Sequence, residues 1–221
     1  LILIRDLTEL RDRDRQLVTK DATIREIHHR VKNNLQTVAA LLRLQSRRMS
    51  NSDAKDALKQ AMGRVSAIAV VHEILSQNFE EQVAFDEVAD RILHMVGDVA
   101  ASSGSVVARR EGSFGEVPAE TATALSLATT ELCQNAIEHS LDSSSGNVIV
   151  RPHRTDDALV VDIVSDGKPL PEGFSLDNHR SSLGLSIVTT LMQDLGGTFT
   201  LEDNSDRVGT CARLVIPLQR L

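Results

Sequence analysis

The sequence has no Trp and no Tyr, and only five Phe and two Cys among its 221 residues. With so few aromatic side chains, the core must be built from Leu, Val, Ile and Ala, a composition that suits helix-rich packing. Cys133 and Cys211 stand far apart and lack the paired spacing of a zinc site. We therefore expect two reduced thiols in a cytosolic protein.

An excess of positive charge is also missing. The 24 Lys and Arg are outnumbered by 31 Asp and Glu, which gives a formal net charge of −7. Because affinity for phosphate backbones comes from clustered positive charge, we expect no direct binding to nucleic acid. No apolar run approaches the roughly 20 residues that cross a bilayer, and no signal peptide is evident, so we expect no membrane segment in this chain and a cytoplasmic location.

The first third of the chain has a helical pattern. Apolar residues recur at steps of three and four from residue 7 to about residue 49, without Pro or Gly, and this spacing predicts a long helix. Turn and capping residues at 50–53 separate it from a second periodic segment that runs to Leu75. We predict an antiparallel hairpin, whose apolar seam would be covered in a homodimer by pairing into a four-helix bundle.

Beyond residue 77 helices and strands alternate. The expected helices lie at 85–101, 119–140 and 183–195, and the expected strands at 105–110, 147–154, 158–164, 198–202 and 210–217. This order predicts an α+β sandwich in which one sheet carries helices on one face. Hydrophobic residues make up 41% of the chain and charged residues 25%, the balance of an ordinary globular protein.

Two adjacent histidines, His28 and His29, lie in the middle of the first helix. A neutral imidazole is the side chain best suited to be a nitrogen nucleophile near neutral pH, so either could carry chemistry. The alternative is structural, with one histidine packed and the other solvated. A shared metal ion is disfavoured because neighbouring helical side chains point about 100° apart.

The helix expected at 119–140 carries Glu131 and Asn135 on one face, because they are four residues apart, with His139 a further turn along. A carboxylate and an amide on one wall can hold Mg²⁺ and its waters against nucleotide phosphates. The alternative for Glu131 is a solvated surface acid, which the apolar residues of this helix disfavour. Gly184 opens another helix, where free N–H groups favour phosphate oxygens.

Four motifs carry a family resemblance. They are His-His-Arg-Val-Lys-Asn-Asn-Leu-Gln at 28–36, Glu-Leu-Cys-Gln-Asn-Ala-Ile-Glu-His at 131–139, Asp-Gly-Lys-Pro-Leu-Pro at 166–171 and Leu-Gly-Leu-Ser-Ile-Val at 183–188, with Gly-Thr at 209–210. In this order they resemble the phosphoacceptor box and the N, G1 and G2 boxes of two-component sensor histidine kinases with a type-2, HWE-related dimerisation domain and a Bergerat-type ATP-binding domain. The resemblance covers roughly residues 20 to 221.

The resemblance implies a protein histidine kinase that phosphorylates itself from ATP with Mg²⁺ and passes the phosphoryl group to an aspartate of a response regulator. It implies three regions: the end of a PAS-like sensor domain with its signalling helix at 1–20, a dimerisation and phosphotransfer hairpin at 21–78, and a catalytic ATP-binding domain at 79–221. His29 takes the acceptor position before Arg-Val-Lys. His28 is less favoured because it lies on the apolar seam.

The same resemblance implies the residues of the nucleotide site. Glu131 would be catalytic and would bind Mg²⁺ through water, while Asn135 would bind Mg²⁺ directly. The residues expected to contact the nucleotide are Asn135, His139, Asp166, Gly167, Leu183, Gly184, Leu185 and Thr210.

Three positions depart from the family pattern. Ser182 and Pro169 stand where the family usually has glycine, and Arg30 stands where many members have an acidic residue after the acceptor histidine. The sequence does not identify another base. The altered boxes leave open a second function, a degenerate scaffold that binds ATP and a regulator without phosphorylating it.

Adenine recognition is the largest departure. A Bergerat site reads the exocyclic amine with an Asp, and the ungapped alignment puts Ser165 in that place and Asp166 one residue later. Strand alternation puts Ser165 on the face of Val161 and Ile163, toward the helices. Gly167 would nevertheless allow the strand to end early and turn Asp166 inward. We predict that Asp166 contacts adenine, so that Asp166→Asn weakens ATP binding at least about tenfold.

Overall fold

The computed structural model describes residues 8–77, 82–101, 106–141, 145–176, 183–205 and 208–218. Side chains are described within these ranges except at 8–21 and 99–101. The first seven residues of the PAS-like region expected at 1–20 and the departure at Ser182 lie outside the described residues.

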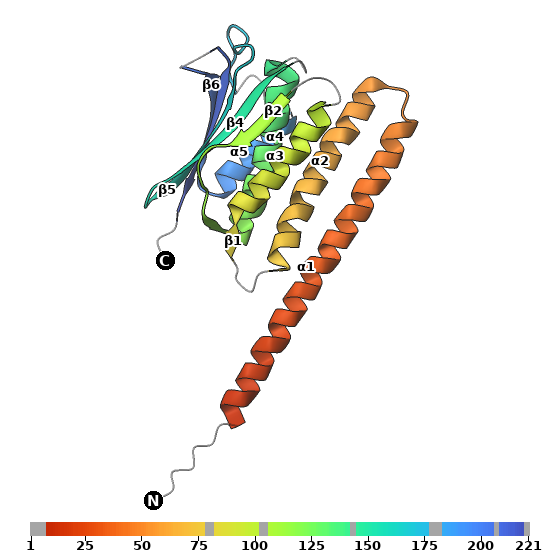
Figure 1. Ribbon diagram of the computed structural model, residues 1–221, viewed down its shortest axis with the longest axis vertical. Helices are drawn as coiled ribbons and strands as arrows, with labels where there is room; N and C mark the ends of the chain where they lie inside the picture. The colour runs from red at the N-terminus through yellow and green to blue at the C-terminus, as the bar shows by residue number, and fades with distance from the viewer. Residues whose placement is uncertain are drawn as a thin grey trace, which may run out of the picture.

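Two long antiparallel helices form an N-terminal hairpin, α1 Thr8–Arg48 and α2 Ser52–Leu75 (Figure 1). Asn51 caps α2, because its side-chain oxygen accepts a hydrogen bond from the Ala54 N–H at 3.2 Å. The hairpin predicted from the apolar periodicity is confirmed. No helix of the described residues is both long and apolar enough to cross a membrane.

The rest of the chain forms an α+β sandwich. Its elements are β1 Gln82–Ala84, α3 Phe85–Ala101, β2 Val106–Arg110, β3 Glu116–Pro118, α4 Ala119–Asn135, the π-helical turn η1 Ala136–Ser140, β4 Gly146–Arg154, β5 Ala158–Ser165, α5 Leu183–Asp194, β6 Thr198–Asp203 and β7 Thr210–Pro217. Five strands form one sheet in the order β2-β4-β5-β7-β6, in which β2 runs parallel to β4 and the other neighbours are antiparallel. The strands β1 and β3 pair separately.

One face of the sheet packs against α3, α4 and α5, as Figure 1 shows. Along β5, Leu159, Val161 and Ile163 are buried and alternate with partly exposed residues, which is the pattern of a sheet covered on one side. On the other face Arg213 forms a bidentate ion pair with Asp162, with Nε–Oδ1 at 2.6 Å. The predicted α+β class, with helices on one face, is therefore confirmed.

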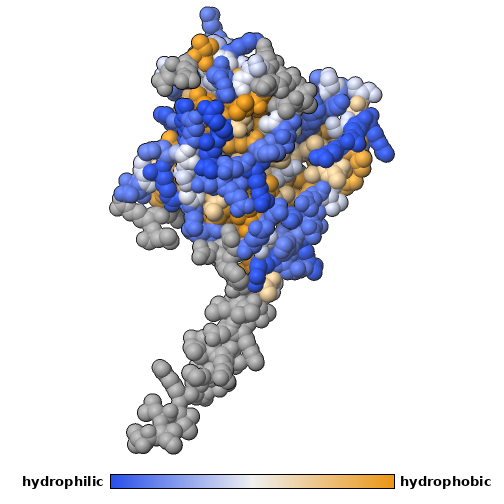
Figure 2. Space-filling view, viewed as in Figure 1, coloured by the Kyte–Doolittle hydropathy of each residue, from blue (hydrophilic) through white to orange (hydrophobic). Residues whose placement is uncertain are grey.

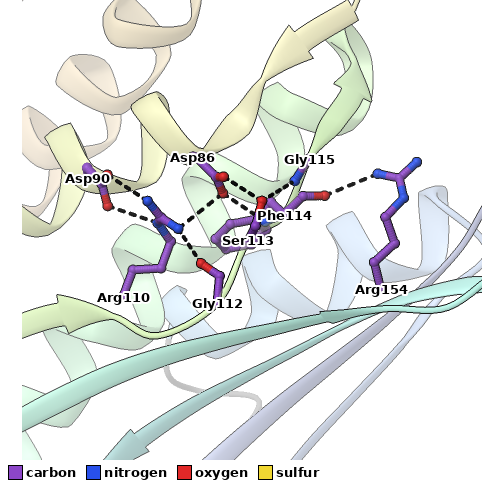
Figure 3. A network of polar contacts seen from close by, with 8 residues as sticks. All are labelled: Asp86, Asp90, Arg110, Gly112, Ser113, Phe114, Gly115 and Arg154. Atoms are coloured by element: carbon purple, nitrogen blue, oxygen red, sulfur yellow. Dashed lines mark hydrogen bonds and ion pairs between the residues drawn. The ribbon is translucent and has the colours of Figure 1, made fainter.

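A polar network joins α3 to the end of β2 and to the loop between β2 and β3 (Figure 3). Arg110 bonds both carboxylate oxygens of Asp90 at 2.9 and 2.8 Å. Asp86 accepts the Phe114 N–H at 2.7 Å, and Arg154 donates to the Phe114 carbonyl oxygen at 3.1 Å. These contacts hold the β2–β3 loop on α3 and bury the Phe114 ring.

Both cysteines are free thiols, as the sequence predicts. Cys133 lies on α4 inside the core, and burial raises the pKa of its thiol to about 12. A thiol that remains protonated is a poor nucleophile and a poor metal ligand. Cys133 therefore acts as a packing residue.

Candidate functional site

A cavity of about 510 Å³ opens between the N-box helix (α4 with its π-helical turn η1), α5 and the inner face of the sheet. Its lining is mostly apolar with a few polar groups: Leu132, Asn135, Ala136, His139, Ser140, Ile163, Lys168, Pro169, Leu170, Pro171, Phe174, Leu185, Leu201, Thr210 and Ala212. Such a lining suits a ligand that has a planar aromatic ring and a polar group attached to it. The cavity brings together residues from all three boxes of the second domain.

The N box and the G2 glycine meet at this cavity. Gly184 is buried in the first turn of α5, where an added Cβ would lie 2.7 Å from Glu131 Oε2 and 3.5 Å from Asn135 Nδ2. Any other side chain would push into the two N-box groups, so the close approach requires glycine. Asn135 Nδ2 is buried and has no hydrogen-bond partner among the described residues, a cost that a ligand oxygen would remove.

Glu131 is bound by a residue that the sequence analysis missed. Arg64 of α2 donates Nε to Glu131 Oε1 at 2.7 Å and Nη2 to Oε2 at 2.8 Å. The Glu131 side chain is only 4% exposed, and this hydrogen bond raises the pKa of Arg64 above its ordinary value. The metal role expected for Glu131 therefore competes with Arg64. The only feature of the sequence that could have indicated this pairing is the presence of an arginine among the apolar residues of α2.

The contact belongs to a larger interface between α2 and the N-box helix. Gly63 approaches Gln134 so closely that an added Cβ would lie 2.6 Å from Gln134 Nε2. Gln60 Nε2 also donates to Glu138 Oε2 at 3.4 Å. Figure 1 shows α2 between α1 and the α+β sandwich. The α+β sandwich therefore packs on the α2 side of the hairpin.

The helix predicted at 119–140 is α-helical only as far as Asn135. It ends in the π-helical turn η1, in which the Leu141 N–H donates to the Ala136 carbonyl oxygen at 3.0 Å. Single π-helical turns are frequent at functional sites. Here the turn brings Ser140 to the wall of the cavity and leaves His139 exposed at its rim.

The two histidines of α1 occupy different environments. His28 is partly buried against α2, with its Nδ1 atom 2.9 Å from Nδ1 of His72, whereas His29 is exposed. Burial lowers the pKa of both His28 and His72, and the charge of the neighbouring His28 lowers the pKa of His72 further. Arg30 is exposed and pairs with Glu26 at 2.7 Å, so it does not contact the described part of the cavity.

Acid should weaken the hairpin through the His28–His72 pair. Because their pKa values lie below 6.5 in the folded state, the unfolded chain binds more protons as the pH falls below about 6.5, and the free energy of unfolding decreases. Urea unfolding at about pH 7.5 and about pH 5.5 measures this difference. His72→Gln removes one of the two groups and should reduce this difference. Equal pH dependence in wild type and His72→Gln would contradict the assignment.

The structure turns Asp166 away from the cavity, contrary to the expectation of an adenine contact. Its Oδ1 accepts the Asn147 N–H at 2.7 Å and its Oδ2 accepts Asn147 Nδ2 at 2.6 Å. Asp166 lines a separate hollow of about 190 Å³ on the outer face of the sheet, beside Arg109 and Arg151. The alternation of β5 continues to its end, and Gly167 serves close packing on Ser140, whose carbonyl oxygen would lie 2.2 Å from an added Cβ.

Ser165 takes the inward place that alternation predicts. It is 1% exposed and lies behind the wall of the cavity, with its Oγ 2.8 Å from Ser140 Oγ and 2.9 Å from Thr210 Oγ1. Thr210 and Leu185 line the cavity, while Leu183 is 61% exposed at the start of α5. Four of the eight expected nucleotide contacts line the cavity, namely Asn135, His139, Leu185 and Thr210. Gly184 lies beside it against Asn135, whereas Asp166, Gly167 and Leu183 are outside the lining.

Two regions of the chain match known protein families. Residues 26–100 match the family described as histidine kinase, and residues 120–220 match the family described as histidine kinase-, DNA gyrase B-, and HSP90-like ATPase. Together the two matches include both histidines of α1, the whole of α2 and the residues that line the cavity.

Individual relatives are similar over nearly the whole chain. It is 51% identical to the sensor histidine kinase PdtaS of Mycobacterium tuberculosis over 99% of this chain and 44% of that protein. The identity is 27% to blue-light-activated histidine kinase 2 of Erythrobacter litoralis, over 90% of this chain and 58% of that protein. A solved histidine kinase domain from an Erythrobacter litoralis blue-light-activated kinase has a TM-score of 0.63 at 26% identity, covering 94% of both chains. The chain thus spans about half the length of the curated relatives that it matches.

Proposed function

The chain belongs to the histidine kinase family, and from that premise we propose that it transfers the γ-phosphoryl group of ATP to a histidine of the first helix, in the same chain or in a second copy. One observation carries the proposal: Gly184 lies against Glu131 and against Asn135 Nδ2, an atom without a hydrogen-bond partner in the described ranges, beside a cavity of about 510 Å³. A helix start, a carboxylate and an amide at one point form a suitable binding site for phosphates and their metal ion.

The residues fit Mg·ATP. Asn135 offers an oxygen of the kind that Mg²⁺ prefers, and its buried Nδ2 is a donor for a phosphate oxygen. Glu131 would hold a metal-bound water once Arg64 releases it. The apolar lining, with Ile163, Leu185 and Ala212, would enclose the base. Bound Mg²⁺ would supply charge neutralisation on the transferring phosphoryl group.

His29 is the proposed acceptor. Its exposed imidazole can approach in line with the γ-phosphorus, so that the N–P bond forms while the bond to the bridging oxygen of the leaving ADP breaks. The imidazole N–H proton leaves to solvent or to a base. The His28–His72 contact on the adjacent side of α1 fixes the helix on α2 and thereby orients His29.

The docked arrangement has a consequence for the reaction. Figure 1 shows α2 between α1 and the ATP-binding domain, and no described residue of α1 lines the cavity, so the cavity does not open onto the acceptor helix. Transfer to His29 therefore requires the domain to leave α2 or to serve the acceptor helix of a second copy. We infer that the Arg64–Glu131 contact belongs to the resting state.

Incubation with Mg²⁺ and ATP labelled on its γ-phosphate tests the proposed activity. We expect a label on the protein that survives alkali and is lost in acid, which is the behaviour of phosphohistidine. A scaffold that binds ATP without transfer would remain unlabelled. An acid-stable label would place the phosphoryl group on a hydroxyl and would also contradict the proposal.

We further propose a homodimer formed through α1. Ile27, Val38 and Leu41 are 53%, 42% and 56% exposed, and their spacing puts them along one side of the helix. Figure 2 shows apolar surface over the upper part of the hairpin. A second copy covering this stripe would complete a four-helix bundle.

Light scattering at micromolar concentration should give twice the monomer mass of 24.1 kDa. Leu41→Glu would place a charge in the covered stripe and should shift the mass toward the monomer, whereas Leu183→Glu, at an exposed position on α5, should not. A wild-type mass near that of one chain would contradict a dimer.

The expected partner of the phosphorylated form is the receiver domain of a response regulator. The family supplies this expectation, and the exposure of His29 is compatible with a second protein reaching the phosphoryl group. Because the reaction consumes ATP, we place it in the cytoplasm.

A further inference from the structure

Three hydroxyl groups form a chain at the sheet end of the cavity. Ser140 and Thr210 line the cavity, and the buried Ser165 joins them through Oγ contacts of 2.8 and 2.9 Å. At one end Ser140 Oγ lies 3.0 Å from the Lys168 carbonyl oxygen, to which it can donate. Thr210 forms the other end and belongs to the lining of the cavity.

No carboxylate joins these hydroxyls in the described lining of the cavity. The neighbouring acid, Asp166, faces the other side of the sheet and accepts both Asn147 donors. A base that entered this end of the cavity would therefore meet neutral hydroxyl groups.

The hydrogen bonds among these three hydroxyl groups can run in either direction. In one arrangement Thr210 donates to Ser165, Ser165 to Ser140, and Ser140 to the Lys168 carbonyl, so the Thr210 oxygen accepts from a ligand. In the reverse arrangement Ser140 donates to Ser165 and Ser165 to Thr210, so Thr210 donates to the ligand. Each hydroxyl carries one proton and two lone pairs, and the Thr210 N–H donates to Ser165 Oγ at 3.2 Å in both arrangements.

Purine bases differ in the group that such a site would meet. Adenine presents an amine donor at position 6, and guanine presents the O6 acceptor there. A carboxylate accepts hydrogen bonds only, so it favours the amine and repels O6. A reversible hydroxyl chain satisfies both.

We propose that the nucleotide site accepts guanine as well as adenine nucleoside triphosphates. Ser165, in place of a carboxylate, is the residue that makes the site unable to distinguish the two bases. This inference rests on the proposed function, because it assumes that the phosphates lie at Asn135 and Gly184 and the base at the hydroxyl chain. Ile163 and Ala212 line the cavity and would pack against the ring faces, which are apolar in both purines.

Calorimetric titration of the whole chain with Mg·ATP and with Mg·GTP tests the proposal. We expect the two dissociation constants to agree within about fivefold. A dissociation constant for GTP that exceeds the value for ATP by about thirtyfold or more would overturn it.

Two variants locate the cause. Ser165→Asp restores an acceptor-only group and should raise the preference for ATP over GTP at least about tenfold; an unchanged preference in the folded variant would overturn the role of Ser165. Asp166→Asn should leave the preference within about twofold of wild type, and a loss of ATP binding there would show that the carboxylate reads the base. If circular dichroism shows that Ser165→Asp is unfolded, the wild-type ratio and Asp166→Asn decide.

The outcomes separate this inference from the proposed function. Binding of ATP without GTP overturns only the inference. Binding of both nucleotides without a phosphohistidine label supports the inference and contradicts the kinase. Binding of neither overturns both.

Discussion

His29→Gln should abolish the alkali-stable label that wild type acquires from Mg·ATP. Glutamine has no nitrogen that can act as a nucleophile at neutral pH, so no phosphohistidine can form at this position. The change lies on an exposed side of α1 and removes no described contact, which means that the hairpin and the cavity should remain intact. Circular dichroism and ATP titration check that the loss is chemical.

His28→Gln is the matched control. His28 contacts His72 and faces α2, and glutamine can still form a hydrogen bond there. We expect reduced but measurable labelling, because the acceptor helix loses part of its fixation and keeps its nucleophile. Labelling that persists in His29→Gln and disappears in His28→Gln would reverse the assignment of the two histidines.

Arg64→Met should destabilise the protein by about 3 kcal/mol or more, because it leaves the buried Glu131 carboxylate without its charged partner. At about 2–4 °C for each kcal/mol in a chain of this size, Tm should fall by at least about 6 °C. Mg·ATP should raise Tm further in this variant than in wild type, since Arg64 no longer competes for Glu131. Thermal unfolding with and without Mg·ATP measures both effects.

Two controls isolate the buried pair. Arg30→Met makes the same change in the pair with Glu26, whose side chains are 76% and 59% exposed, and should cost less than about 1 kcal/mol. Adding Glu131→Gln to Arg64→Met removes the unpaired charge and should recover part of the lost stability. A Tm for Arg64→Met within about 1 °C of wild type would contradict a buried pair.

The sequence predicts the regular elements of this protein because their patterns are local. The helix α3 begins and ends at the predicted residues, since its apolar positions repeat at helical spacing and flank an acidic first turn. The strands β1 and β3, of three residues each, were missed because so short a segment carries no readable alternation.

The site shows where local reasoning fails. Alternation along β5 correctly pointed Ser165 inward, and the prediction went to Asp166 because a carboxylate suits adenine better. That choice ignored Asn147, whose two donors hold Asp166 on the outer face from a different strand. Arg64 was missed for the same reason, since its partner Glu131 lies 67 residues away in the other domain. Pairings of this kind depend on how the elements pack.

The most direct measurement is to locate the phosphoryl group on the wild-type chain after incubation with Mg·ATP. Tandem mass spectrometry of peptides kept at alkaline pH distinguishes His28 from His29 and both from hydroxyl residues. The account predicts a single phosphorylated residue, His29. A phosphoryl group on a serine or threonine, or a chain that binds ATP and remains unmodified, would contradict it.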